Sequence, residues 1–212
     1  MGGATAMSLG PQVEPRLPLW LAVAFHAAMA AIALIWQSFR PEGILGLVRV
    51  PFEHVLPWWG AAVGTAWILV LGPAWLEDKL PSLKAVSVEL YESVAPITTW
   101  RVAVLAGMSG LSEELLFRGP LQATIGWVPA ALLFGLAHGG LAKRQRPWML
   151  FALLAGLLMG WMVEYYGALS PAMVAHITVN AINMKRLQRY APLAERLRLR
   201  QSPAAPQEQA NE

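Results

Sequence analysis

The sequence contains no cysteine, which excludes disulfide bonds, thiolate metal sites and a cysteine nucleophile. It is also poor in charge, since only 14% of its 212 residues are charged, against roughly 25% in a soluble domain. Hydrophobic residues make up 56% of the chain, and several apolar runs approach the ~20 residues that a helix needs to cross a bilayer. The sequence therefore predicts an all-α, polytopic transmembrane helical bundle with no room for a second, soluble domain.

About six membrane spans are expected from the apolar runs, each close to the length of a bilayer crossing. In chain order they cover residues 17–39, 57–76, 97–125, 129–141, 148–166 and 171–184. Gly119 and Pro120 should kink the third span, because a proline lacks the backbone donor and crowds the preceding turn. In the fifth span, the pattern Gly156-x-x-x-Gly160 favours close helix packing.

An interfacial amphipathic helix is expected between the second and third spans. Val86, Leu90 and Val94 recur there every four residues, which places them on one helical face.

The chain reads as a single transmembrane helical domain, residues 17–184, with a catalytic core of about residues 97–184. A basic juxtamembrane segment is expected at 185–200, and disorder at 1–16 and 201–212. Most lysines and arginines would lie on one side of the membrane if both termini were cytoplasmic, which predicts that orientation.

An acidic cluster in the third span is the strongest functional signal. The stretch LSEELLFRGP places Glu113, Glu114 and Arg118 inside an apolar run, where each charge costs ~2.5–3.5 kcal/mol at the helix centre. Glu114 and Arg118 are four residues apart in the favourable order for a helical ion pair. Glu113 projects ~100° away from that pair and is a candidate general base. The alternative is a buried ion network that only fixes helix packing.

Two later spans add polar groups at comparable depth. His138 follows Phe134 by four residues, and Asn180 follows His176 by four, so each pair shares a helical face. A rise of ~1.5 Å per residue brings Glu113, His138 and His176 near one level of the bilayer. Alone, each histidine is more often a structural group. Together, a base, two imidazoles and an amide donor form a set suited to attack of water on a carbonyl.

These three motifs resemble those of the CPBP family, which includes type II CAAX prenyl endopeptidases and bacterial bacteriocin-processing or immunity proteins. The resemblance covers about residues 109–183. It implies a glutamate-dependent intramembrane endopeptidase in which Glu113 activates water with help from His138. His176 and Asn180 would bind the oxyanion. The motif residues Glu114, Arg118 and Phe134 would support the site.

By the same resemblance, the expected substrate is a membrane-anchored protein or peptide, with a C-terminal sorting or lipidated signal as one candidate. No cofactor, metal or nucleic acid is expected, and the bilayer is the other partner. The compact size is similar to the bacterial members, which implies a multi-pass protein of the bacterial inner membrane.

Other readings stay open at this stage. Glu113, His138 and His176 offer the His₂Glu set of a zinc-dependent intramembrane protease, although no His-Glu-x-x-His is present. A non-catalytic membrane scaffold or immunity protein is a second alternative, and a proton-coupled transporter is a third. His26 and Glu164 have no partner evident in the sequence and are expected to serve packing or snorkelling.

Overall fold

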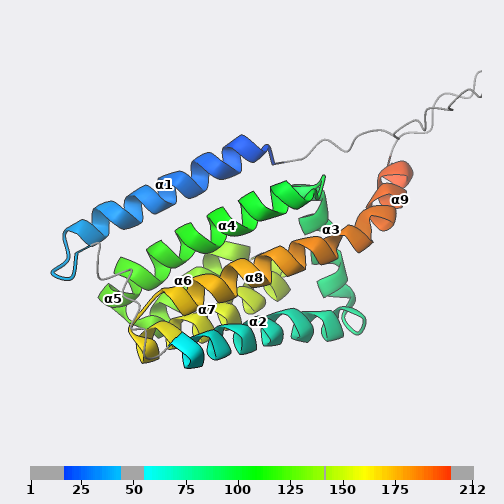
Figure 1. Ribbon diagram of the computed structural model, residues 1–212. Coiled ribbons are helices and arrows are strands. Elements are labelled where there is room, and N and C mark those ends of the chain that lie inside the picture. Colours follow the sequence, from blue (N-terminus) through cyan, green and yellow to red (C-terminus); the bar gives the residue numbers. More distant parts are fainter. Residues whose placement is uncertain (1–16, 44–54, 141, 202–212) are drawn as a thin grey trace, which may run out of the picture.

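The computed structural model describes residues 17–43, 55–140 and 142–201, and every regular element within those ranges is helical (Figure 1). The predicted all-α fold is thus confirmed. The helices are α1 Leu19–Ser38, α2 Val55–Glu77, α3 Pro81–Val94, α4 Thr99–Leu116, α5 Gln122–Ile125, α6 Trp127–Gly139, α7 Arg146–Tyr166, α8 Ser170–Leu187 and α9 Ala191–Gln201. The disorder expected at 1–16 and 202–212 lies outside the described residues, whereas Gln201, placed in that tail, ends α9.

The long helices lie side by side, with α4 between α1 and α8 (Figure 1). Helix α8 in turn packs against α2, while α6 and α7 form an antiparallel hairpin with the most extensive helix–helix contact. Helix α3 crosses one end of the bundle, where α9 packs against it. The order α1–α4–α8–α2 makes α4 and α8 the central helices.

Three helical segments of the described chain are long and apolar enough to cross a membrane: Leu19–Ser38, Val55–Glu77 and Lys143–Tyr166. The pair Pro81–Val94 and Thr99–Ile125 meets the same criterion jointly, but it is bent by 105° and counts as a fourth span only if it is one crossing. These apolar helices make the chain an integral membrane protein. The expected total of about six spans stays a prediction.

The α6–α7 hairpin packs closely through small residues. A side chain on Gly156 would lie 3.2 Å from both Cα and Cβ of Ala131, and one on Gly160 would lie 3.2 Å from Oε1 of Gln122. The predicted role of this glycine pattern in helix packing is confirmed. The hairpin thereby fixes the depth of His138 near the end of α6.

The predicted kink follows α4 directly. Residues Phe117–Leu121 form a π-helical turn, labelled η3, in which Gly119 leaves helical geometry with ψ of −117°. Pro120 has no backbone proton to donate, and its carbonyl accepts a hydrogen bond from Thr124 Oγ1 at 2.6 Å. The turn leaves Arg118 only 3% exposed.

Helix α3 is the helix expected between the second and third spans, but its inner face differs from the predicted one, because Leu90 and Val94 are only half-buried while Ser87 and Glu92 are buried. It buries Val86 and Val88, and it binds the loop after α6 through Glu89, which pairs with Arg144 at 2.6 Å and accepts from Gln145 at 2.9 Å. The basic segment after residue 184 is also largely helical, because α8 continues to Leu187 and α9 follows. Its Tyr190 joins Val88 in a small apolar cluster.

Candidate active site

Helices α4 and α8 approach each other closely at the acidic cluster. A Cβ atom on Gly110 would lie 2.6 Å from Cγ1 and 2.9 Å from the backbone nitrogen of Ile177. Only glycine fits at this position, since real Cβ atoms essentially never come so near another heavy atom. The contact lies one helical turn before Glu113 and Glu114 and next to His176, so it brings the acidic and imidazole groups within reach of each other.

Glu113 lies between the two predicted catalytic histidines. Its Oε2 atom is 3.4 Å from Nε2 of His138 and 3.7 Å from Nε2 of His176. The side chain is contributed by α4, the histidines by α6 and α8, and Glu113 is only 7% exposed. The structure therefore brings together three groups that lie far apart in the sequence, as the depth argument predicts.

The ring of His138 is oriented by its own helix. Its Nδ1 atom lies 2.8 Å from the carbonyl oxygen of Phe134, and because a carbonyl can only accept, Nδ1 carries the proton. Nε2 is consequently the atom presented to Glu113. Trp148 also packs against the imidazole ring of His138, with the two ring centroids 5.9 Å apart.

The ring of His176 is oriented by the second carboxylate. Nδ1 lies 2.7 Å from Oε1 of Glu114, whose other oxygen lies 3.2 Å from Nε of Arg118. Glu114 is fully buried, and Arg118 nearly so. The predicted Glu114–Arg118 ion pair is present. Glu114 has a second role that the sequence did not indicate, which is to orient the ring of His176.

Asn180 lies one turn beyond His176 on α8, and its amide donates to Ser109 Oγ on α4 at 2.8 Å. One of the two amide protons is therefore used to join α4 and α8. The second proton remains for another acceptor. Asn180 borders the site and also strengthens the same helix pair that Gly110 brings together.

Phe134 is the apolar centre of the site. Its ring lies 4.2 Å from the centroid of His138 and 5.9 Å from that of His176. The guanidinium carbon of Arg118 lies 4.4 Å from the same ring, on a side where a cation is attracted to the aromatic face. Phe134 is 2% exposed. One side chain thus packs against three charged or titratable groups of the motifs.

His26 is a polar neighbour of the site that sequence reasoning assigned to packing. Its Nδ1 atom lies 2.8 Å from Oγ of Ser112, the residue just before Glu113. The only available signal was a histidine in the middle of an apolar span, since its partner is distant in the sequence. Glu164, which was assigned in the same way, is exposed and lies 3.4 Å from Nε2 of Gln122 on the neighbouring α5.

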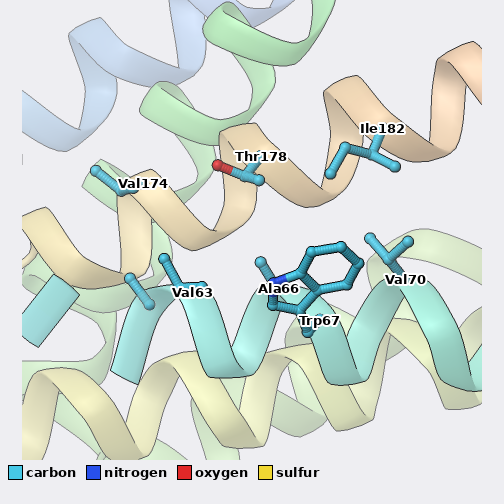
Figure 2. A pocket seen from close by; sticks show the side chains of 8 residues that line it. Val63, Ala66, Trp67, Val70, Val174, Thr178 and Ile182 are labelled. Carbon is cyan, nitrogen blue, oxygen red and sulfur yellow. The ribbon is translucent and has the colours of Figure 1, made fainter. Parts of the chain in front are cut away.

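Two cavities flank the site without containing its carboxylates. An apolar groove of about 110 Å³ lies along the line where α2 packs against α8, and Val63 and Trp67 face Thr178 and Ile182 there (Figure 2). These α8 residues lie on a different side of the helix from His176, which faces α4. A second, polar cavity of about 250 Å³ lies beyond η3 and includes Arg118 among its walls.

Within the described part of the chain, no group of three or more histidine, aspartate or glutamate side chains is arranged to hold a metal ion. In the set formed by Glu113, His138 and His176, each ring bonds a protein acceptor through Nδ1 and turns Nε2 toward Glu113. Metal-ligating histidines bond their second nitrogen in the same way, so metal analysis decides the zinc-dependent alternative.

Comparison with known proteins agrees with the motifs. Residues 95–182 match the family model described as type II CAAX prenyl endopeptidase Rce1-like. An uncharacterized protein of Bacillus subtilis (strain 168), YpbD, is 34% identical over 83 residues, which cover 38% of this chain and 42% of that relative. No solved structure matches the chain. The resemblance inferred from the sequence is confirmed for the segment that carries all three motifs, and the match spans less than half of the curated relative.

Proposed function

We propose that this chain, whose residues 95–182 match the type II CAAX prenyl endopeptidase-like model, is an intramembrane endopeptidase that uses Glu113 to activate water. The observation that carries the proposal is the position of the Glu113 carboxylate, 3.4 Å and 3.7 Å from the Nε2 atoms of two histidines inside an apolar bundle. Charged groups are costly in this environment, so their convergence favours a functional role.

Glu113 and His138 together suit the binding of the nucleophilic water. Nδ1 of His138 keeps its proton and donates a hydrogen bond to the carbonyl of Phe134. Nε2 of the neutral ring can therefore accept a hydrogen bond from one O–H of the water, while Glu113 accepts a hydrogen bond from its second O–H. Glu113 then takes a proton as the water oxygen attacks the peptide carbonyl. When the tetrahedral intermediate collapses, the C–N bond breaks and the same proton passes to the leaving amine.

His176 and Asn180 are proposed to stabilise the oxyanion. His176 already donates Nδ1–H to Glu114, so its Nε2 can donate only when the ring carries both protons. Glu114 stabilises that cation, and Asn180 keeps one amide proton for the oxyanion.

The buried charges support this protonation state of His176. Glu113 and Glu114 contribute two negative charges, while Arg118 and the doubly protonated His176 contribute two positive charges. The cluster is then neutral as a whole, which lowers the cost of placing it in a medium of low dielectric constant. A neutral His176 would leave one negative charge without a counterpart among these four groups.

The proposed substrate is a membrane-anchored protein or peptide, because its scissile bond has to reach a site enclosed by apolar helices. A C-terminal sorting or lipidated signal, as in CAAX processing, is the candidate class. Its acyl or prenyl portion would remain among the lipids while the peptide bond enters the bundle.

The proposed location is a bacterial inner membrane with both termini cytoplasmic. Several basic side chains lie at the end of the bundle that α3 crosses. Arg144 pairs with Glu89 of α3, and Arg186 and Arg189 both pair with Glu77, just before α3 begins. Arg40 lies at the other end, against Thr124. This asymmetry is that of the positive-inside rule.

Co-expression with candidate membrane-anchored substrates tests the proposal. New protein termini would be mapped by mass spectrometry with the wild type, with Glu113→Ala, and with Glu164→Gln as a membrane carboxylate outside the site. Support would be termini that appear with the wild type and Glu164→Gln but disappear with Glu113→Ala. Identical termini with all three proteins would refute a glutamate-dependent cleavage.

A further inference from the structure

The contact between His26 and Ser112 joins α1 to the catalytic helix at the depth of the site. Nδ1 of His26 and Oγ of Ser112 are 2.8 Å apart, and Ser112 is 1% exposed. Ser112 immediately precedes Glu113 in α4, so any shift of its turn moves the carboxylate as well. Ser112 also lies within 3.5 Å of the carbonyl of Ser109, the residue that binds Asn180.

The orientation of His26 is determined by the packing face of α1. Ala22 and Ala33 are buried on that face, and His26 follows Ala22 by four residues. The adjacent Phe25 is 59% exposed, but its ring meets that of His26 edge-on, with centroids 5.3 Å apart. Helix α1 packs chiefly on α4, with a smaller contact to η3. His26 is thus the titratable group on a face that otherwise buries Ala22, Ala33 and Gln37.

His26 also lies within electrostatic range of the reacting groups. Glu113 on α4, His138 on α6 and His176 on α8 all act on its ring. The other charged groups on the elements that α1 touches are Arg101 at the far end of α4, which donates to the Val94 carbonyl, and Glu114 and Arg118, which form an ion pair. A change of charge at His26 would therefore be felt mainly by the Glu113 carboxylate and the two imidazoles.

We propose that His26 is a positioning residue for Glu113, acting through the hydrogen bond to Ser112 and, at acidic pH where the ring gains a proton, through its charge. The inference rests on the proposed function, because it assigns a role to His26 in setting the general base. A purely structural contact would stabilise the α1–α4 pair without altering how cleavage depends on pH. A positioning role changes both the turnover rate and its pH profile.

Matched substitutions separate the two contributions. In His26→Asn, the side-chain amide can occupy the place of Nδ1 and keep the bond to Ser112, but it does not titrate. His26→Leu loses both properties, and Ser112→Ala loses only the bond. Ile35→Leu is the control, because Ile35 is 61% exposed and lies nine residues from His26, on the opposite face of α1. We expect kcat to fall about tenfold or more in His26→Leu and Ser112→Ala with little change in KM, because misplacement of a reacting group slows the chemical step.

His26→Asn is expected to recover most of the lost kcat while its pH profile differs from that of the wild type. The proposal is overturned if His26→Leu keeps the wild-type kcat and pH profile, or if His26→Asn is as impaired as His26→Leu with an unchanged profile. Ile35→Leu should match the wild type in each measurement.

A second measurement needs no substrate and separates this proposal from the proposed function. The ring nitrogens of His138 and His176 can be followed by ¹⁵N NMR of histidine-labelled protein in lipid nanodiscs during a pH titration. If His26 faces Glu113, the two titrations move in His26→Asn but not in Ile35→Leu. Unchanged titrations would overturn the role of His26, even if the protein cleaves its substrate. Shifted titrations in a protein without peptidase activity would support the positioning of Glu113 and contradict the proposed function alone.

Discussion

The carboxylate of Glu114 accepts a hydrogen bond from His176 at 2.7 Å, deep inside the helix bundle. Its second oxygen faces Arg118 at 3.2 Å, so a single buried acid connects a positive charge to a candidate catalytic imidazole. The neighbouring Glu113 has no arginine partner and faces both histidines. Two adjacent glutamates therefore have different environments, one stabilising and one placed for reaction.

Arg118→Leu should destabilise the protein, because it leaves Glu114 as a buried charge with only His176 as a partner. Breaking a buried ion pair in this way costs about 3–5 kcal/mol. The double variant Glu114→Gln, Arg118→Leu removes both charges and should recover part of that loss. Thermal unfolding in the same detergent measures both effects. Equal stability of the single variant and the wild type would contradict the assigned pairing.

Gly110→Ala should disrupt the site without touching any of its polar groups. The added methyl would meet Ile177 at 2.6 Å from Cγ1 and 2.9 Å from its backbone nitrogen, so α4 and α8 have to move apart. Overpacking of this kind costs about 1–3 kcal/mol. Because Glu113 and His176 lie on these two helices, we also expect cleavage to fall by about tenfold or more, given how strongly rates depend on reacting-group geometry.

Gly107→Ala is the matched control for this substitution. It lies on the same helix one turn earlier, and a methyl group there meets nothing within 4 Å. Replacing glycine by alanine inside a helix then favours folding by up to about 1 kcal/mol. Gly107→Ala should keep the wild-type cleavage rate and raise the unfolding midpoint slightly, whereas Gly110→Ala should lower both. Normal cleavage by Gly110→Ala would show that the α4–α8 spacing does not control the site.

Metal chelation should leave the activity intact. The proposed chemistry needs Glu113 and His138 to hold a water and needs no Lewis acid, so purified protein should cleave its substrate in the presence of 1,10-phenanthroline. Elemental analysis should find zinc well below one atom per chain. Stoichiometric zinc, together with loss of activity on chelation and recovery on adding zinc, would establish the zinc-dependent alternative instead.

Much of the helical architecture could be predicted, because the length of an apolar run and the glycines and prolines that end or kink helices are local signals. The kink at Gly119 and the turn at Gly126 between α5 and α6, where φ is +88°, both follow from residues beside them. The meeting of Glu113 with His138 and His176 was also predictable, since helical rise converts sequence spacing into depth. Depth alone, however, does not fix how a helix is rotated about its axis.

The rotation of each helix about its axis decides which side chains meet, and the sequence alone does not determine that rotation. How the two glutamates are placed, with Glu114 on His176 and Glu113 between His138 and His176, depends on the tight contact between α4 and α8. That contact, between Gly110 and Ile177, joins residues remote in the sequence. The pairing of His26 with Ser112 spans 86 positions and has no local pattern. For the same reason the bond from Asn180 to Ser109 could not be foreseen, although the two residues lie at the same level of adjacent helices.

The central claim is that the Glu113 carboxylate activates the water that cleaves a peptide bond. It is tested most directly by comparing purified wild type and Glu113→Gln in nanodiscs, with one fluorogenic membrane-anchored peptide and with His138 and His176 unchanged. The amide keeps the size of the side chain but cannot take a proton, so the account predicts a loss of about 10²–10⁴-fold in kcat with KM nearly unchanged. Cleavage by Glu113→Gln within a few-fold of the wild-type rate would contradict it.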